Sequence, residues 1–352
     1  MVNYKIGVVM RNCFKKSVVI ALVFSLICSF AFAKGAKENS SVNTDKILFT
    51  DDLNRTVELD KTLTRIAPSG HMATVILLTF DPSLLTGLSR KIDYSYFSED
   101  ISRLPVYGAL YSTGSSLNKE EVLSSHPQVI IDIGEIKGST EKMTEDLDNL
   151  SNSLGIPTVF IKSNFDDIAH TYRKLGELLG KEERGKELAL YAEESIKFAE
   201  RIRNSVKTPK TYYYSTSVDG LQSFGNGNLH IELFDKIGAM NIVSGSPTGN
   251  VNVSLEEIFR ADPDVIILEN AEAYKTVMDK GSRWSNLRAV KNGDVYLVPN
   301  NIYSWIDSPP SVNRLLGVYY LADIFYPELV QVDIKAEARR YFLLFYNFNL
   351  NI

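Results

Sequence analysis

The stretch Lys181–Asn204 most constrains the fold of this 352-residue chain. It contains no Gly or Pro after Gly185. Its apolar and small residues recur every three to four positions, which places them on one narrow helical stripe: Leu188, Tyr191, Ala192, Ser195, Ala199 and Ile202. A helix of this length spans roughly 35 Å at ~1.5 Å per residue, about the width of a small domain. The pattern fits either an ordinary surface helix or a helix that connects two domains.

Closely similar segments on either side of this helix favour the connecting role. Residues 117–135 (LNKEEVLSSHPQVIIDIGE) and 253–271 (VSLEEIFRADPDVIILENA) match at six positions when aligned at an offset of 136 residues. Each segment predicts a capped helix, a proline break and a continuous apolar run typical of a buried parallel strand. A helix–strand unit on each side of a long helix implies two lobes of like architecture.

The first 33 residues predict export. Four basic residues and no acidic one precede the apolar run Ser17–Phe32, and Ala31-Phe32-Ala33 fits a signal-peptidase site. A retained membrane anchor is the alternative, and the run is short for one. Both cysteines, Cys13 and Cys28, lie in this segment. The apolar residues around Cys28 favour a cleaved leader over a lipid-modified N-terminus.

The mature chain then has no cysteine, so it can form neither disulfides nor thiolate metal sites. The whole chain carries a net charge of −5, and removal of the basic leader makes it more acidic. An acidic chain argues against a nucleic-acid partner. These features predict an exported, soluble, acidic protein.

The order of predicted elements divides the chain into five parts. They are a signal peptide (1–33), a flexible tether (34–46), an N-terminal α/β lobe (47–180), a connecting helix (181–207) and a C-terminal α/β lobe (208–352). Within the C-terminal lobe, Pro309 and Pro310 are expected to open a helix that runs to about Phe325. A last helix within Asp333–Phe348 is expected to pack on the same lobe.

Two histidines fall at predicted strand-to-helix junctions, one in each lobe. His71, with Met72 beside it, follows a strand at the sheet edge where open α/β folds bind ligands. His230 opens a helix after the Gly-rich loop of the second lobe. Each histidine either hydrogen-bonds its own loop or faces the other across a cleft. In the second case both could contact a ligand, and a metal ion is one such ligand.

Aromatic residues concentrate in the loops predicted at the rim of this cleft: Tyr94, Tyr96, Tyr107, Tyr111, Phe224, Tyr303 and Trp305. Loop aromatics supply a large apolar contact with a polar tip, which suits a flat or bulky ligand. A single one more often packs inside a lobe, but seven on rim loops predict an aromatic cleft. Glu135 and Arg314 complete the candidate ligand-binding set. The alternative for Arg314 is an ordinary arginine on a helix surface.

Enzyme signatures are mostly missing from the sequence. It has no phosphate loop, no His-Glu-x-x-His, no Gly-x-Ser-x-Gly and no cysteine nucleophile. The competing hypothesis is an exported enzyme that uses the same cleft, with Glu135, His71 and His230 as acid–base groups.

The chain resembles the substrate-binding proteins of bacterial ABC importers for iron–siderophore complexes, haem and cobalamin. The resemblance lies in Arg65–Ser89, the two repeat copies and Tyr303–Tyr326 (YSWIDSPPSVNRLLGVYYLADIFY). It implies a class III periplasmic binding protein, with two Rossmann-like α/β lobes bridged by one long α-helix. It further implies no enzymatic activity, no intrinsic cofactor and a metal chelate bound between the lobes. The partners implied are an inner-membrane permease dimer and its cytoplasmic ATPase.

The resemblance also implies that one surface glutamate per lobe docks onto the permease, and these correspond to Glu120 and Glu256. The adjacent Glu121 and Glu257 instead fit helix-starting capping boxes. The cargo stays open, because relatives carry ferric siderophores, haem, corrinoids, bare metal ions or oxyanions such as molybdate. Few basic residues fall on the predicted rim, which weighs against a small oxyanion. We expect a free periplasmic monomer rather than a lipoprotein.

Overall fold

The computed structural model describes residues 45–97, 101–111, 116–307 and 310–352. Residues 48–352 form one compact unit, and only residues 45–47 of the preceding chain are described. The predicted signal peptide, both cysteines and nearly all of the predicted tether therefore lie outside the described residues. Within the described part, no helix is both long and apolar enough to cross a bilayer.

The N-terminal half is built on a three-stranded parallel sheet of order β3-β4-β5. The central strand β4 is buried along nearly its whole length, as its continuous apolar run predicts. The elements of this half are β1 (Lys46–Thr50), β2 (Thr56–Asp60), β3 (Ile66–Pro68), α2 (His71–Phe80), α3 (Lys119–Ser124), β4 (Val129–Gly134), α4 (Thr140–Leu154), β5 (Thr158–Lys162) and α5 (Ile168–Leu179). Strands β1 and β2 pair with each other in a separate two-stranded sheet.

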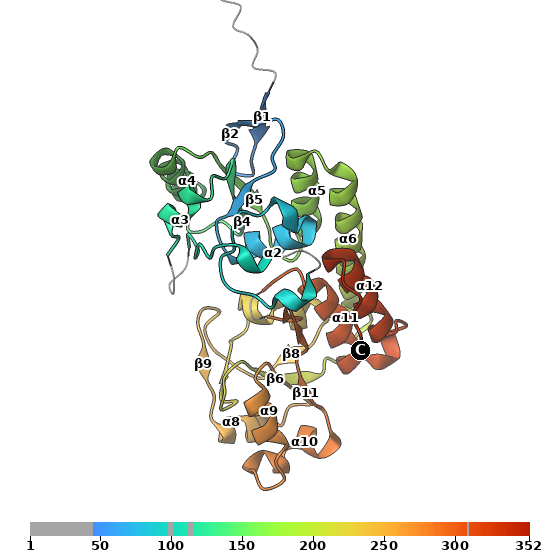
Figure 1. Cartoon of the computed structure of the whole chain (residues 1–352). Coiled ribbons are helices and arrows are strands. Elements are labelled where there is room, and N and C mark those ends of the chain that lie inside the picture. The colour runs from blue at the N-terminus through green and yellow to red at the C-terminus, as the bar shows by residue number, and fades with distance from the viewer. Residues whose placement is uncertain (1–44, 98–100, 112–115, 308–309) are drawn as a thin grey trace, which may run out of the picture. The chain divides into compact units, whose positions relative to one another are not determined.

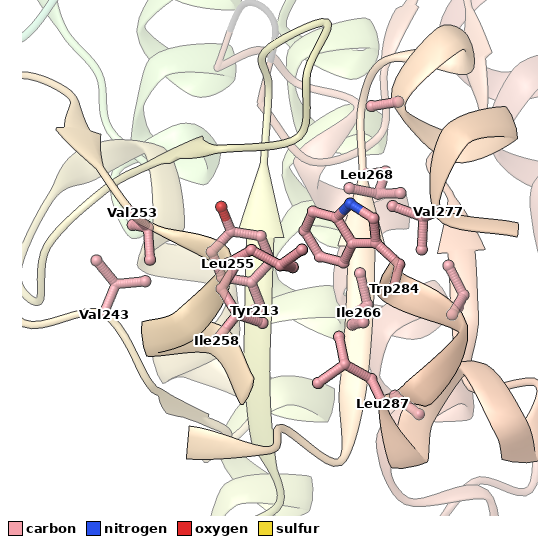
Figure 2. Close-up of a cluster of buried hydrophobic side chains, with 13 residues drawn as sticks. Tyr213, Val243, Val253, Leu255, Ile258, Ile266, Leu268, Val277, Trp284 and Leu287 are labelled. Carbon is pink, nitrogen blue, oxygen red and sulfur yellow. The ribbon is translucent and has the colours of Figure 1, made fainter. Parts of the chain in front are cut away.

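The C-terminal half holds a four-stranded parallel sheet of order β11-β10-β6-β8. One of its cores packs Tyr213 of β6 against Trp284, with ring centroids 6.2 Å apart (Figure 2). The helices of this half are α7 (Glu232–Lys236), α8 (Leu255–Ala261), α9 (Ala271–Met278), α10 (Arg288–Asn292), α11 (Arg314–Phe325) and α12 (Ile334–Tyr346). Its strands are β6 (Thr211–Ser215), β7 (Gln222–Ser223), β8 (Met240–Asn241), β9 (Val251–Asn252), β10 (Val265–Leu268), β11 (Val295–Leu297), β12 (Asn300–Asn301) and β13 (Tyr303–Ser304).

The two repeat copies occupy equivalent places in the two sheets. Copy one forms α3 and β4, and copy two forms α8 and β10. The matched residues Ile130 and Ile266 each lie on an interior strand: Ile130 pairs with Ala67 and Thr158, and Ile266 with Tyr213 and Val295. The prediction of two lobes with like architecture is confirmed.

The connecting helix is α6 (Glu182–Ser205), and every residue of its predicted stripe is buried. It lies beside α5 (Figure 1). The two helices approach closely because Gly185 faces Gly176. A Cβ on Gly185 would lie 2.5 Å from the carbonyl oxygen of Tyr172. Helix α6 also packs against α11 of the second half, so it is a connecting helix rather than a surface one.

The last helix, α12, corrects one expectation. It packs on α11, as predicted, but it also contacts the first half. The ring of Phe345 lies 5.8 Å from that of Tyr172 in α5 and 5.3 Å from that of Tyr191 in α6. The ring of Tyr346 lies 5.8 Å from that of Phe97. Because large aromatic side chains line α12, it buries them against both halves rather than one.

Helix α11 begins later than expected. Its first residue is Arg314, whereas Pro310 is not helical and Pro309 lies outside the described residues. The buried side chain of Asn313 holds this start in place. Its amide nitrogen donates to the carbonyl oxygen of Tyr303 over 3.0 Å, and its Oδ1 accepts from the hydroxyl of Tyr341 over 2.9 Å. These side-chain bonds fix the chain before the first turn of the helix.

Candidate functional site

A cavity of about 260 Å³ lies between the two halves of the 48–352 unit. Its first wall is formed where β3, β4 and β5 end, together with the start of α2. Its second wall consists of Leu229, residues 310–311 and the first turn of α11. The first wall is the carboxyl edge of a parallel sheet, at which open α/β folds bind ligands.

Five of the candidate ligand-binding residues line this cavity: His71, Met72, Tyr111, Glu135 and Arg314. Four come from the first half, and Arg314 comes from the second. Tyr111 and Glu135 are exposed, whereas His71 and Met72 are half-buried.

Arg314 is a buried cation at the cavity wall, with 5 % of its side chain exposed. Its Nη2 donates to Glu232 Oε2 over 2.9 Å and to the carbonyl oxygen of Leu229 over 3.2 Å. The guanidinium carbon lies 5.8 Å from the centre of the Phe165 ring in the opposite wall. Its Nε–H is buried and has no hydrogen-bond partner among the described residues. A buried donor without a partner is costly, so this N–H calls for a partner that the described residues do not supply.

Three polar residues of the first wall were not among the candidates predicted from the sequence. Ser69 follows β3, Asp132 lies near the end of β4, and Ser163 follows β5. The hydroxyl of Ser69 donates to Asp132 Oδ1. The hydroxyl of Ser163 is buried and lacks a partner in the part of the chain that the structure describes. All three residues lie at the carboxyl edge of the sheet, the same edge at which His71 was predicted, so the same rule could have found them.

Burial shifts the pKa of two titratable groups in this wall, Asp132 and His71. Burial raises the pKa of Asp132 to about 6, although the Ser69 hydrogen bond and the charges of Lys137 and Arg55 oppose the shift. Burial, aided by the positive charge of Arg90, lowers the pKa of His71. His71 Nδ1 shares a hydrogen bond of 2.7 Å with Ser89 Oγ. His71 is therefore largely neutral at pH 7.

The start of α2 adds a positive partial charge to the cavity. Its N-cap is Gly70, so no side chain accepts the N–H groups of the first turn. Gly70 and His71 both line the cavity. An anion placed here would meet the favourable end of the helix dipole.

His230 does not face His71 across the cavity. Its ring stacks on Phe224 with centroids 4.5 Å apart, and its Nδ1 lies 2.5 Å from Asp307 Oδ1. This is the local hydrogen-bonding alternative of the sequence analysis. Among the residues described, no group of three or more His, Cys, Asp or Glu could hold a metal ion. The paired-histidine metal site is thus without support.

Most of the candidate aromatics belong to the core rather than to the cavity. Tyr107, Phe224, Tyr303 and Trp305 are buried, and the cavity lining includes none of them. These four side chains were expected on the cleft rim, but they are buried instead. Two of them lie close against a glycine. The ring of Tyr107 lies directly over Gly87, and the backbone of Trp305 lies against Gly317.

The tyrosine pair of the 94–96 turn also lies apart from the cavity lining. The Tyr96 ring lies 5.1 Å from that of Phe348, and its hydroxyl accepts from Asn301 Nδ2 over 3.2 Å. Tyr94 is half-buried in the same short turn. Of the seven aromatics, only Tyr111 lines the cavity.

Glu120 and Glu256 are exposed in the first turns of α3 and α8. Glu256 Oε1 lies 2.5 Å from Arg283 Nη2, and both side chains are largely exposed. The neighbouring Glu257 completes a capping box with Ser254, as expected. In copy one, Asn118 accepts the Glu121 N–H over 3.2 Å, which is the N-cap half of such a box.

Residues 88–302 match the periplasmic binding protein family. The chain belongs to this family. A molybdate-binding protein of Haemophilus influenzae is 23% identical, with 94% of this chain and 96% of that one covered. An Fe(3+)-citrate-binding protein of Bacillus subtilis is 28% identical, with 52% and 57% covered. A solved ABC transporter solute-binding protein of Sulfurospirillum deleyianum aligns with a TM-score of 0.77 at 29% identity, covering 86% of this chain and 96% of that one.

This periplasmic binding protein has the fold expected from the resemblance, α/β with parallel sheets joined by a long helix. The family binds solutes without converting them and carries no intrinsic cofactor. The hypothesis of an exported enzyme that uses Glu135, His71 and His230 is therefore wrong. Membership also implies an exported protein that works with an ABC permease and its ATPase.

Proposed function

We propose that this protein captures a compact anionic metal species in the cavity and delivers it to an ABC permease. The species we favour is a small metal chelate with carboxylate or similar oxygen groups on its surface. One observation carries the proposal. Arg314, buried and held by Glu232, lines the cavity, and its Nε–H has no partner among the described residues. A fixed guanidinium suits anionic oxygen, because its donors are planar and always charged.

The size of the cavity narrows the class of chelate. About 260 Å³ lies just below the range of roughly 300–1,000 Å³ usual for ligand pockets. Such a space suits a compact chelate better than a haem or a corrinoid. The burial of Tyr303 and Trp305 also argues against a haem or a corrinoid, because these buried rings supply no flat aromatic surface to a large ring system. The similarity to the Fe(3+)-citrate-binding protein of Bacillus subtilis supports a small carboxylate chelate.

A small oxyanion such as molybdate is the second candidate. It is favoured by the similarity to the Haemophilus influenzae molybdate-binding protein, which extends over nearly the whole chain. Lys137 and Arg314 both line the cavity, and α2 starts there without a side-chain cap. These groups weaken the sequence-based argument that too few basic residues surround the site.

Delivery would use the two exposed glutamates. Glu120 and Glu256 occupy matching places at the starts of α3 and α8, so each lobe presents one carboxylate. A permease with two-fold symmetry presents the same basic site twice. We infer that the protein acts as a periplasmic monomer released from its signal peptide, and that these carboxylates dock it.

Calorimetric titration of the purified mature protein tests the proposal. The panel is ferric citrate, molybdate, haem and cobalamin, and metal analysis of the untreated protein accompanies it. The proposal predicts one-to-one binding of ferric citrate or molybdate, and weak or no binding of the two macrocycles. Tight binding of haem or cobalamin alone would refute it.

A further inference from the structure

Two carboxyl groups line the cavity, and their surroundings differ. Asp132 lies near the end of β4 with 7 % of its surface exposed. Glu135 lies three residues later, beyond the strand, and is exposed. Both are close to a space that the proposed function fills with an anion. A buried carboxylate and an anionic ligand repel each other strongly, because little water screens them.

Asp132 has few partners that could hold its negative charge. Its Oδ1 accepts one hydrogen bond from the hydroxyl of Ser69. In the described parts of the chain, no lysine or arginine lies within ion-pair distance of it, and no hydrogen bond reaches its Oδ2. Burial therefore dominates, and the pKa of Asp132 rises to about 6.

The charged and titratable groups around Asp132 come from several segments. Lys137 follows β4, and Arg55 belongs to the β1–β2 hairpin. Arg55 is already paired with Asp51 over 2.6 Å. Tyr111 and His71 share the cavity wall. Burial and the charge of Asp132 raise the pKa of Tyr111, so the phenol stays neutral, and the lowered pKa of His71 leaves the imidazole largely neutral at pH 7.

We propose that Asp132 links ligand capture to the uptake of one proton from solvent. The proton binds the carboxyl oxygen that faces the cavity, and the neutral acid then donates a hydrogen bond to an oxygen of the anionic ligand. No other bond forms or breaks. This inference rests on the proposed function, because only an anionic ligand favours the protonated form. A cationic ligand would release the proton instead.

The pH dependence follows from this assignment. The ligand-free group titrates at about 6, and a bound anion moves its pKa higher. Below pH 6 both states carry the proton, and affinity does not depend on Asp132. Between pH 6 and the pKa of the complex, binding takes up a proton, so affinity falls by up to about tenfold per pH unit. Above that window both states are ionised and affinity is low.

Calorimetric titration of the mature protein with ferric citrate and with molybdate, from pH 5.5 to 8, tests the inference. The wild type should lose affinity above pH 6, while Asp132→Asn should bind at pH 8 about as tightly as the wild type does at pH 6. The amide can accept from Ser69 and donate to the ligand, as the neutral acid does. Glu135→Gln is the matched control and should keep the wild-type slope. Any protonation of the free ligand affects all three proteins equally, so it does not alter the comparison of their pH slopes.

A second measurement needs no variant. At pH 7, binding enthalpies in HEPES and in Tris, whose ionisation heats differ, report the number of protons taken up. A value approaching one supports the inference. Zero uptake, or equal pH slopes for the wild type and Asp132→Asn, overturns it while leaving the proposed function intact. Failure of both probes to bind at every pH would instead refute the proposed function, and the inference with it.

Discussion

Arg314 Nη2 lies 2.9 Å from Glu232 Oε2, and this contact joins the first residue of α11 to the first residue of α7. The same nitrogen donates to the carbonyl oxygen of Leu229. One edge of the guanidinium is thus held by the protein, while its buried Nε–H has no partner among the described residues. Positioning of this kind lowers the entropy that a binding group loses when a ligand arrives.

Arg314→Ala should therefore weaken ligand affinity by at least about tenfold, since a hydrogen bond between charged groups contributes roughly 1.5–3 kcal/mol. Arg314→Lys should recover only part of this loss, because the compact lysine ammonium lacks the planar guanidinium whose fixed donors can bond to Glu232 and to a ligand at once. Calorimetric titration gives the affinities. Arg283→Ala, at an exposed arginine outside the cavity, is the control and should bind as the wild type does. Unchanged affinity in Arg314→Ala would remove this residue from the site.

Reversing the charge at both lobe tips should abolish uptake without affecting ligand binding. Glu120→Arg combined with Glu256→Arg would face the basic permease surface with like charge. Each single change should impair uptake in part, as measured with radiolabelled ligand in cells. The control is Glu257→Ala, which removes half of a capping box and should cost about 1 kcal/mol of stability but spare uptake. Normal uptake by the double variant would contradict the docking assignment.

Gly317→Ala should destabilise the protein by at least about 2 kcal/mol, although alanine normally favours a helix. A Cβ at this position would lie 2.0 Å from the carbonyl oxygen of Trp305 and 2.9 Å from Leu233 Cδ2. Urea unfolding measures the effect. In Gly281→Ala the nearest atom to the new Cβ would be 3.6 Å away, so this variant should unfold like the wild type. Equal stability of the two variants would show that Trp305 packs less closely against Gly317 than described.

Glu269 should make the protein less stable as pH rises toward 7. Burial raises its pKa from 4.5 to about 7, although Ser304 and Tyr214 donate hydrogen bonds to it. A folded-state pKa above the unfolded value gives stability that is fully present below pH 4.5 and lost as pH rises to about 7. The loss is at most about 3 kcal/mol. Urea unfolding of the wild type and of Glu269→Gln should be compared across this pH range. The free energy of unfolding of Glu269→Gln should lack this loss, and the same pH dependence in both proteins would refute the prediction.

The elements governed by local pattern could be predicted from the sequence. The stripe of α6 and the two helix–strand repeats have periodicities that only a helix and buried strands satisfy. Their place in the fold followed from symmetry, since two like segments on either side of one helix imply two lobes. Of the residues that line the cavity, His71 was predicted from its position at a helix start beside a strand end, and Arg314 was a candidate as one of the few basic residues near the predicted rim. The same rule would have found Asp132 and Ser163 had it been applied to every strand.

The aromatic residues show what sequence reasoning could not decide. Tyr107 and Trp305 occur in loops, where exposure is the simple expectation, but both are buried beside a glycine distant in sequence. Helix α12 was predicted as a helix, yet its contacts with Tyr172 and Tyr191 depend on how the two halves meet. Tertiary contacts of this kind decide whether a large side chain is buried, and a single sequence does not reveal them.

Anomalous diffraction would locate the bound metal within the protein. Iron and molybdenum both scatter X-rays anomalously, so crystals grown with ferric citrate or with molybdate would mark the ligand by its metal atom. We predict one anomalous peak inside the cavity, between Ser69 and Asp132 on one wall and Arg314 on the other. A bound metal species located elsewhere, with the cavity filled only by water, would contradict it.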